Sequence, residues 1–189
     1  MPLSPPAPRA PLHRRAIDIR GFQRDDGLFD IEAQLTDTKT YALTNRDRGT
    51  IAPGVPLHGM WVRLTVDEDL MIVACEAQTD FAPYSICPQA APNFSRLAGV
   101  RIGAGFNRAV HERVGGTIGC THLREVLGQM ATTAYQTLTA HRMRRDAAAG
   151  RRREGPNPQL GTCLAYAPDS PVVLRDERPA PVEEPVAAN

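Results

Sequence analysis

Thiol, imidazole and carboxylate side chains gather in a few short segments of this sequence. The first such segment, Thr79 to Pro88, carries Asp80, Tyr84 and Cys87 directly after an apolar run. We expect it to leave a buried strand and enter a loop, where functional residues are often held on a rigid scaffold. Asp80 is a candidate acid or base, and Tyr84 is a candidate substrate contact. The alternative is that Asp80 caps a turn and Cys87 is a small buried apolar residue.

A second segment, residues 115–122, is rich in glycine and precedes the clearest helical pattern of the chain. A helix N-terminus presents unpaired amide hydrogens and a partial positive charge. We therefore expect it to attract an anion and to favour the thiolate of Cys120, a candidate nucleophile or metal ligand. His122 is a candidate proton-transfer group. Three further residues are candidate substrate contacts, namely Gly116, Gly119 and Thr121. The alternative is a tight glycine turn before a packed helix.

A third set of candidates lies in the run from Leu57 to Val66. If this run is a strand, alternation places His58 on one face and both Trp61 and Arg63 on the other. His58 is a candidate general base or ligand, and Arg63 is a candidate substrate contact. The alternatives are a hydrogen-bonded core histidine and a tryptophan that belongs to the core.

Sulfur, nitrogen and oxygen donors of these segments would also suit zinc or iron. The candidate metal ligands are Cys87, Cys120, His122 and Asp80. None of the four cysteines forms a CxxC pair, so the spacing does not indicate a structural zinc finger. A metal is therefore an open possibility, and the cofactor is not specified by the sequence.

The elements that must position these residues follow a strands-then-helices order. Alternating apolar and polar residues between turn formers predict antiparallel strands at residues 16–20, 28–35, 40–43, 60–66 and 70–79. The stretch Leu70 to Ala74 is continuously apolar, as in a strand covered on both faces. Helices are expected at residues 92–98, 106–114 and about 121–145, with Thr121 as the N-cap of the last. This order predicts an α+β fold: antiparallel hairpins form a sheet in the N-terminal half, and helices pack on it in the C-terminal half.

Composition sets the domain organisation and the classes of partner. The 189 residues suffice for one well-buried core. We expect a flexible proline-rich arm over residues 1–12, a single domain over 13–145, an extension over 146–177 able to dock on the core, and a disordered tail over 178–189.

The charge balance and the N-terminus restrict partners and location. A net charge of +1 does not favour nucleic acid or an anionic membrane. The N-terminus lacks an apolar signal region, and no stretch approaches the ~20 apolar residues of a membrane span. We expect a cytoplasmic protein with reduced thiols, a small-molecule substrate and an open possibility of a homo-oligomer.

A series of motifs resembles a bacterial family known only as a domain of unknown function. The motifs are His13-Arg14-Arg15, Asp26 to Ala33, Asp37-Thr38-Lys39, Pro56-Leu57-His58, Met60 to Leu64, Thr79-Asp80, Ile86-Cys87-Pro88, Gly103 to Phe106 and Gly119 to Leu123. The resemblance covers roughly residues 13–140 and implies one fold unit without an established activity. Gly59 stands where the family pattern has an acidic residue, and Ala104 where it has proline. The order of elements is also similar in architecture to iron–sulfur cluster scaffold proteins.

Three hypotheses about function follow. The first is a small-molecule enzyme of the lyase or hydrolase type, acting on a carboxylate such as an aromatic acid of bacterial catabolism. Its pocket would lie between the sheet and the long helix, lined by Asp80, Cys87, Cys120, His122 and His58. The second is a non-catalytic carrier of zinc, iron or sulfur on the same cysteines. The third is an interaction domain in which these residues serve only as core and caps.

Overall fold

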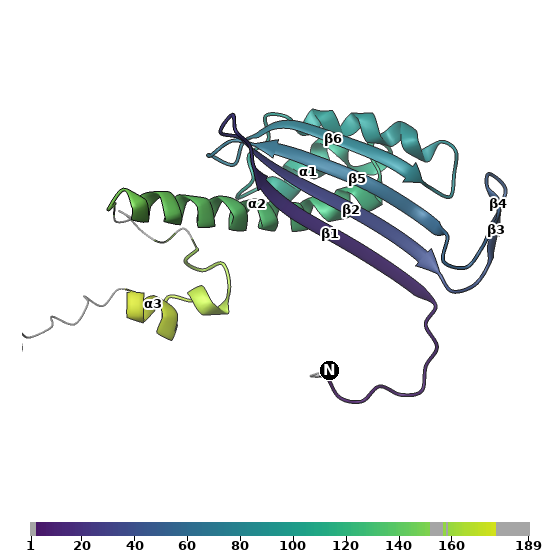
Figure 1. Ribbon diagram of the computed structural model, residues 1–189, viewed down its shortest axis with the longest axis horizontal. Helices are drawn as coiled ribbons and strands as arrows, with labels where there is room; N and C mark the ends of the chain where they lie inside the picture. The colour runs from purple at the N-terminus through teal and green to yellow at the C-terminus, as the bar shows by residue number, and fades with distance from the viewer. Residues whose placement is uncertain (1–2, 152–156, 158, 177–189) are drawn as a thin grey trace, which may run out of the picture. The chain divides into compact units, whose positions relative to one another are not determined.

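The computed structural model describes residues 3–151, 157 and 159–176 (Figure 1). The chain divides into two compact units, residues 1–144 and residues 145–189. The first unit holds the sheet, the helices that cover it and every candidate site residue of the sequence. Residues 3–12 have no regular structure, and the Thr40 hydroxyl donates a hydrogen bond to the carbonyl of Pro11 (2.7 Å).

Four antiparallel strands form the sheet of the first unit. They are β1 (His13–Gln23), β2 (Phe29–Lys39), β5 (Pro56–Val66) and β6 (Ile72–Phe81), in the order β1-β2-β5-β6. Between β2 and β5 the chain forms a separate two-stranded ribbon from β3 (Leu43–Asn45) and β4 (Gly49–Ile51). The antiparallel sheet in the N-terminal half confirms the predicted fold class.

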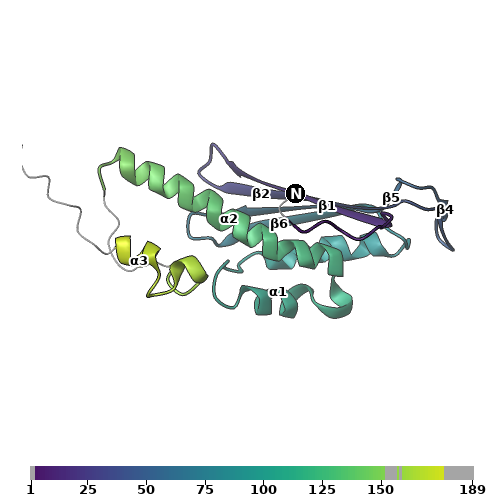
Figure 2. The same ribbon diagram turned by 90° about the horizontal axis from the view of Figure 1, so that it is seen from below.

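Helices from the C-terminal half cover one face of this sheet, as Figure 2 shows. In chain order they are η1 (Cys87–Leu97), α1 (Phe106–Val114), η2 (Gly116–Ile118) and α2 (Thr121–Ala148), of which η1 and η2 are 3-10 helices. Inward side chains of the strands meet them in one core, which contains Phe29, Ile31, Leu35, Leu64, Ile72, Phe94, Leu127 and Met130. This burial of apolar surface fixes the start of α2 against the sheet.

The second unit contains the short helices η3 (Leu164–Tyr166) and α3 (Pro171–Asp176). Docking of residues 146–177 on the core remains a prediction, and the expected tail over 178–189 lies outside the described residues. Of the helices that the structure describes, not one has the length and apolar character needed to cross a membrane.

Several local expectations were wrong. Val73 is 48% exposed, so the Leu70 to Ala74 run is covered on one face only and the other face of the sheet is open. The helix expected at 92–98 is a 3-10 helix that begins at Cys87, and its internal Pro92 lacks the amide hydrogen that an α-helix would need. The strand expected at 40–43 is the short β3, which begins at Leu43.

The start of α2 also differs from expectation. Thr121 is the first helical residue rather than the N-cap. The carbonyl of Cys120 accepts the hydrogen bond of the Arg124 amide (3.0 Å), so Cys120 itself occupies the N-cap position. The thiol therefore lies at the point where the helix begins.

Candidate functional site

Three polar residues lie directly opposite one another on three neighbouring strands. Arg15 of β1 pairs with Asp37 of β2, and Asp37 pairs with His58 of β5. Directly opposed residues of antiparallel strands share a face of the sheet. This face is the one that the helices cover, so the register alone brings a guanidinium, a carboxylate and an imidazole together beside the core.

The carboxylate of Asp37 is the centre of this group. Its side chain is 1% exposed, and Arg15 binds both of its oxygens, with Nε and Nη2 each at 2.8 Å. His58 Nδ1 lies 3.0 Å from Oδ2, and His13 Nε2 lies 3.3 Å from Oδ1. Burial alone would raise the pKa of Asp37, but the hydrogen bonds and charge of Arg15 hold it below its ordinary value. Asp37 is thus an ionised carboxylate in an almost fully buried place.

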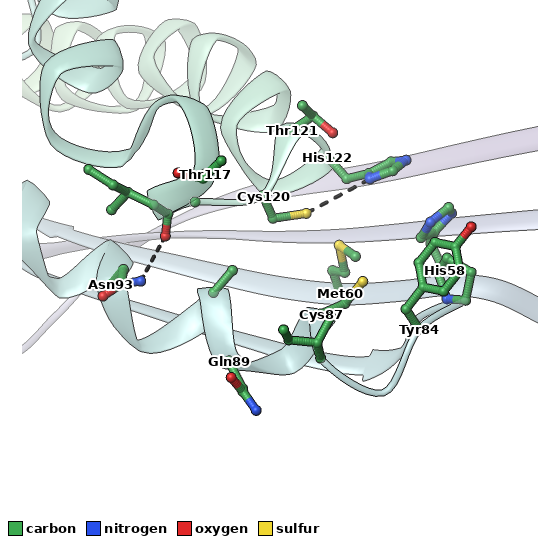
Figure 3. Close-up of a pocket in the computed structure, with 15 residues that line it drawn as sticks. His58, Met60, Tyr84, Cys87, Gln89, Asn93, Thr117, Cys120, Thr121 and His122 are labelled. Atoms are coloured by element: carbon green, nitrogen blue, oxygen red, sulfur yellow. Dashed lines mark hydrogen bonds between the residues drawn. The ribbon is translucent and has the colours of Figure 1, made fainter. Parts of the chain in front are cut away.

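The first turn of α2 adds an imidazole and a thiol to this centre. The rings of His122 and His58 stack with their centroids 3.9 Å apart and a 32° angle between the planes. His122 Nε2 lies 3.9 Å from Asp37 Oδ2. On its other side, His122 Nδ1 lies 3.8 Å from Cys120 Sγ (Figure 3). One carboxylate therefore faces two imidazoles, and one of these faces a thiol.

Both imidazoles are held in the neutral form near pH 7. Burial lowers the pKa of His58, the neighbouring His122 lowers it further, and Asp37 only partly opposes the change. Burial and the charge of Arg15 likewise lower the pKa of His122. Because the ionised carboxylate accepts a hydrogen bond from His58 Nδ1, the unprotonated nitrogen of that ring is Nε2. A neutral imidazole with a free nitrogen can accept a proton.

A cavity of about 550 Å³ opens beside these groups, between β5, η1 and the start of α2. Figure 3 shows side chains of α2 on one side of this space and those of η1 on the other. Its lining is mixed. The residues with polar or sulfur-bearing groups include His58, Cys87, Gln89, Asn93, Thr117, Cys120, Thr121 and His122, and the largely apolar ones are Met60, Pro83, Tyr84, Ile86, Ala90 and Ile118. The cavity fits a small molecule that has an apolar body and a polar reacting group.

The structure brings most of the predicted site residues to this one cavity. Its lining includes His58, Tyr84, Cys87, Gly119, Cys120, Thr121 and His122. Cys87 and Cys120, which were expected in one pocket, both line this cavity. Gly116 does not line the cavity; it is the first residue of η2 and has a positive φ of 58°.

Asp80 and Arg63 lie elsewhere, on the exposed face of the sheet. Asp80 accepts a hydrogen bond from Trp61 Nε1 (2.9 Å), and Arg63 pairs with Glu76 (2.7 Å). The predicted loop starts later than expected, because β6 continues to Phe81. Asp80 is therefore still part of the strand, and the alternation of side chains places it on the face opposite the cavity.

Sequence reasoning missed His13, Arg15 and Asp37. A signal for Asp37 was present: the inward positions of β2 are Phe29, Ile31, Ala33, Leu35 and Asp37. A charged residue in register with four buried apolar ones indicates a paired, buried carboxylate. The expected strand ended at Leu35, which hid this pattern. An acid beside His58 thus comes from the neighbouring strand rather than from position 59.

The expected metal set is not assembled, because Asp80 is absent from the cavity. Ligand atoms of Asp37, His58 and His122 do lie within 4.8 Å of one another, and such donors suit zinc or iron. Arg15, however, already binds both oxygens of Asp37. A cation at this position would lie beside a guanidinium that cannot lose its proton. The geometry therefore favours proton transfer over metal binding.

Comparison with models of protein families gives a match. A family model described as "Protein of unknown function (DUF2889)" matches residues 13–136. This range extends from β1 into α2 and includes each residue that surrounds Asp37. Neither the curated proteins nor the solved structures contain a match to this chain.

Proposed function

The chain belongs to the DUF2889 family, and we propose that it is a hydrolase- or lyase-type enzyme that acts on a small molecule. The observation that carries the proposal is the hydrogen bond between the buried Asp37 carboxylate and His58 Nδ1 at the cavity wall (3.0 Å). A carboxylate in this position orients the imidazole and stabilises the positive charge that it gains on accepting a proton. His58 is the proposed general base.

The substrate would lie with its apolar part against Met60, Tyr84 and Ile86 and its reacting group near the two imidazoles. The first amides of α2 have no partner within the helix and carry partial positive charge. They would stabilise an anionic oxygen of the substrate, either a carboxylate or an oxygen that gains charge during the reaction. An aromatic or aliphatic carboxylic acid derivative meets both requirements.

Activity measurements on a panel of small carboxylic acid derivatives test this proposal. For any substrate that turns over, we expect His58→Gln to lower kcat by roughly 10²–10⁴-fold, the usual contribution of a general base. Asp37→Asn is expected to act in the same direction through the orientation of His58. Asp80→Asn is the matched control, because it removes a carboxylate from the exposed face of the same sheet. Unchanged activity in His58→Gln would contradict the proposal.

The metal-carrier alternative can be separated by elemental analysis of the untagged protein, purified without added metal. Under the proposed function, zinc and iron are substoichiometric, and activity survives treatment with a chelator. One equivalent of either metal, lost together with activity in His58→Gln, would favour the carrier or a metalloenzyme instead.

A further inference from the structure

The four cysteines differ sharply in their surroundings. Cys75 is buried in the core, and burial raises the pKa of its thiol to about 12. Cys163 is exposed in the second unit. Cys87 and Cys120 both line the cavity. Among these cysteines, all of which the structure describes, Cys120 alone has an imidazole nitrogen within hydrogen-bond distance of its sulfur.

We propose that Cys120 is a nucleophile that forms a thioester with the acyl group of a carboxylic ester or thioester substrate. The inference rests on the proposed function and deepens it. Its basis is a continuous set of contacts in which Cys120 Sγ faces His122 Nδ1 at 3.8 Å and His122 Nε2 faces Asp37 Oδ2 at 3.9 Å. A nucleophile beside a base, with a carboxylate near enough to stabilise the imidazolium that forms when the base takes the proton, is an arrangement suited to covalent catalysis.

The N-cap position of Cys120 supports the same role. Cys120 directly precedes the first turn of α2, since its carbonyl accepts the first helical hydrogen bond, and the amides of that turn have no partner within the helix. A thiolate at a helix N-terminus is stabilised by the partial positive charge there. The same amides can stabilise the oxygen of a tetrahedral intermediate formed at this sulfur. The N-terminus of α2 would thus stabilise both the attacking thiolate of Cys120 and the anionic oxygen of the intermediate.

The two imidazoles allow a division of the proton transfers. In the first half, His122 takes the thiol proton, Sγ attacks the carbonyl carbon, and the bond from that carbon to the leaving oxygen or sulfur breaks. The departing group receives the proton from His122. In the second half, His58 Nε2 takes a proton from water, the resulting hydroxide attacks the thioester, and the carbon–sulfur bond breaks. The proton held by His58 returns to the thiolate, so an ester and water give an acid and an alcohol, or a thioester and water give an acid and a thiol, with no oxidation or reduction.

The cavity indicates which acyl group this site would take. Met60, Tyr84, Ile86 and Ile118 line it together with the catalytic groups. An apolar acyl body, aromatic or aliphatic, would remove these surfaces from water, and this burial contributes to binding. Esters and thioesters of apolar carboxylic acids are the proposed substrate class.

Reaction of the full chain with p-nitrophenyl esters of benzoic acid and of short fatty acids tests the inference. Wild-type protein should release p-nitrophenolate in a burst approaching one equivalent, followed by slower turnover. His58→Gln should accumulate the acyl adduct, which intact-protein mass spectrometry would detect and peptide mapping would locate on Cys120. His122→Gln should slow the burst roughly 100-fold or more. Cys120→Ala and Cys120→Ser should show neither burst nor thioester.

Controls separate the failure of this inference from the failure of the proposed function. Cys163→Ser should retain the burst and the adduct, because this cysteine is not among the residues that line the cavity. Turnover that persists in Cys120→Ala while still requiring His58 would overturn the nucleophile and leave the general base standing. An adduct located on Cys87 would also overturn the assignment. Absence of both burst and turnover with every ester, in protein shown to be folded by circular dichroism, would count against both proposals.

Discussion

The two faces of the sheet carry similar rows of charge in opposite environments. On the covered face, Arg15, Asp37 and His58 stand opposite one another across three strands. On the open face, a second row crosses all four strands and consists of Arg20, Glu32, Arg63 and Glu76. The open row alternates in sign, and the covered row places a guanidinium, a carboxylate and a neutral imidazole side by side. The strand register brings the members of each row together, so strand pairing alone does not distinguish a functional site from a solvent-exposed surface.

Burial makes the difference between these two rows. Asp37 is 1% exposed, whereas Arg63 is 44% and Glu76 is 72% exposed. Water and salt screen exposed ion pairs, which typically contribute ~0–1 kcal/mol. A buried pair has lost its water, and removal of one partner leaves the other without compensation. The covered row is therefore the one whose members should be sensitive to substitution.

The largest effect should come from Asp37→Ala. This change removes the partner of Arg15 and of His58 at once, and we expect it to lower the free energy of unfolding by roughly 3 kcal/mol, the lower end of the range for broken buried pairs. The lower end applies because Arg15 is partly exposed and retains Glu125 (3.2 Å). Urea denaturation measures the change. A decrease in the free energy of unfolding of only ~0–1 kcal/mol, as for an exposed ion pair, would contradict the proposed difference between the two faces of the sheet.

Acidification should lower the free energy of unfolding by an amount between these extremes. His58 and His122 have a pKa below 6.5 in the folded protein, so the unfolded chain takes up protons first as pH falls through 6.5. The free energy of unfolding should therefore decrease below pH 6.5, until both rings are also protonated in the folded state. Asp37, with its pKa lowered, adds a second loss as pH falls below 3.8.

The double variant His58→Gln/His122→Gln isolates the first of these losses. Urea denaturation at a series of pH values on either side of 6.5 should show a shallower decline than in wild type. Arg63→Gln, on the open face, is the control and should leave the slope unchanged. Identical slopes in wild type and the double variant would mean that the two imidazoles are not desolvated as described.

The smallest effect is expected for Arg63→Gln itself. The substitution removes ion pairs to Glu76 (2.7 Å) and Glu32 (3.7 Å) on the open face. All three side chains are substantially exposed, so the free energy of unfolding should change by less than ~1 kcal/mol. Thermal or urea unfolding at low and high salt measures it. A larger loss would show that the open face is not a solvated surface.

Sequence reasoning found those parts of the site that depend on local pattern. The apolar spacing of α2 located the helix start and with it Cys120 and His122, because helix periodicity is read within one segment. The partner of His58 could not be found in this way. Asp37 meets His58 only through the register of β2 on β5, which depends on residues far apart in the chain. Asp80 was misplaced because the end of β6 at Phe81 was set by pairing and not by composition.

Arg15 connects an edge of the sheet to the helical layer. Its strand, β1, hydrogen-bonds within the sheet only to β2, and edge strands are where a sheet opens most easily. Arg15 nevertheless binds Asp37 of β2 and Glu125 of α2, which lies 110 residues further along the chain. Local opening of β1 must therefore break contacts with two layers and leave a buried negative charge. Because of this coupling, the rate of amide hydrogen exchange along β1 should indicate how often Arg15 leaves Asp37.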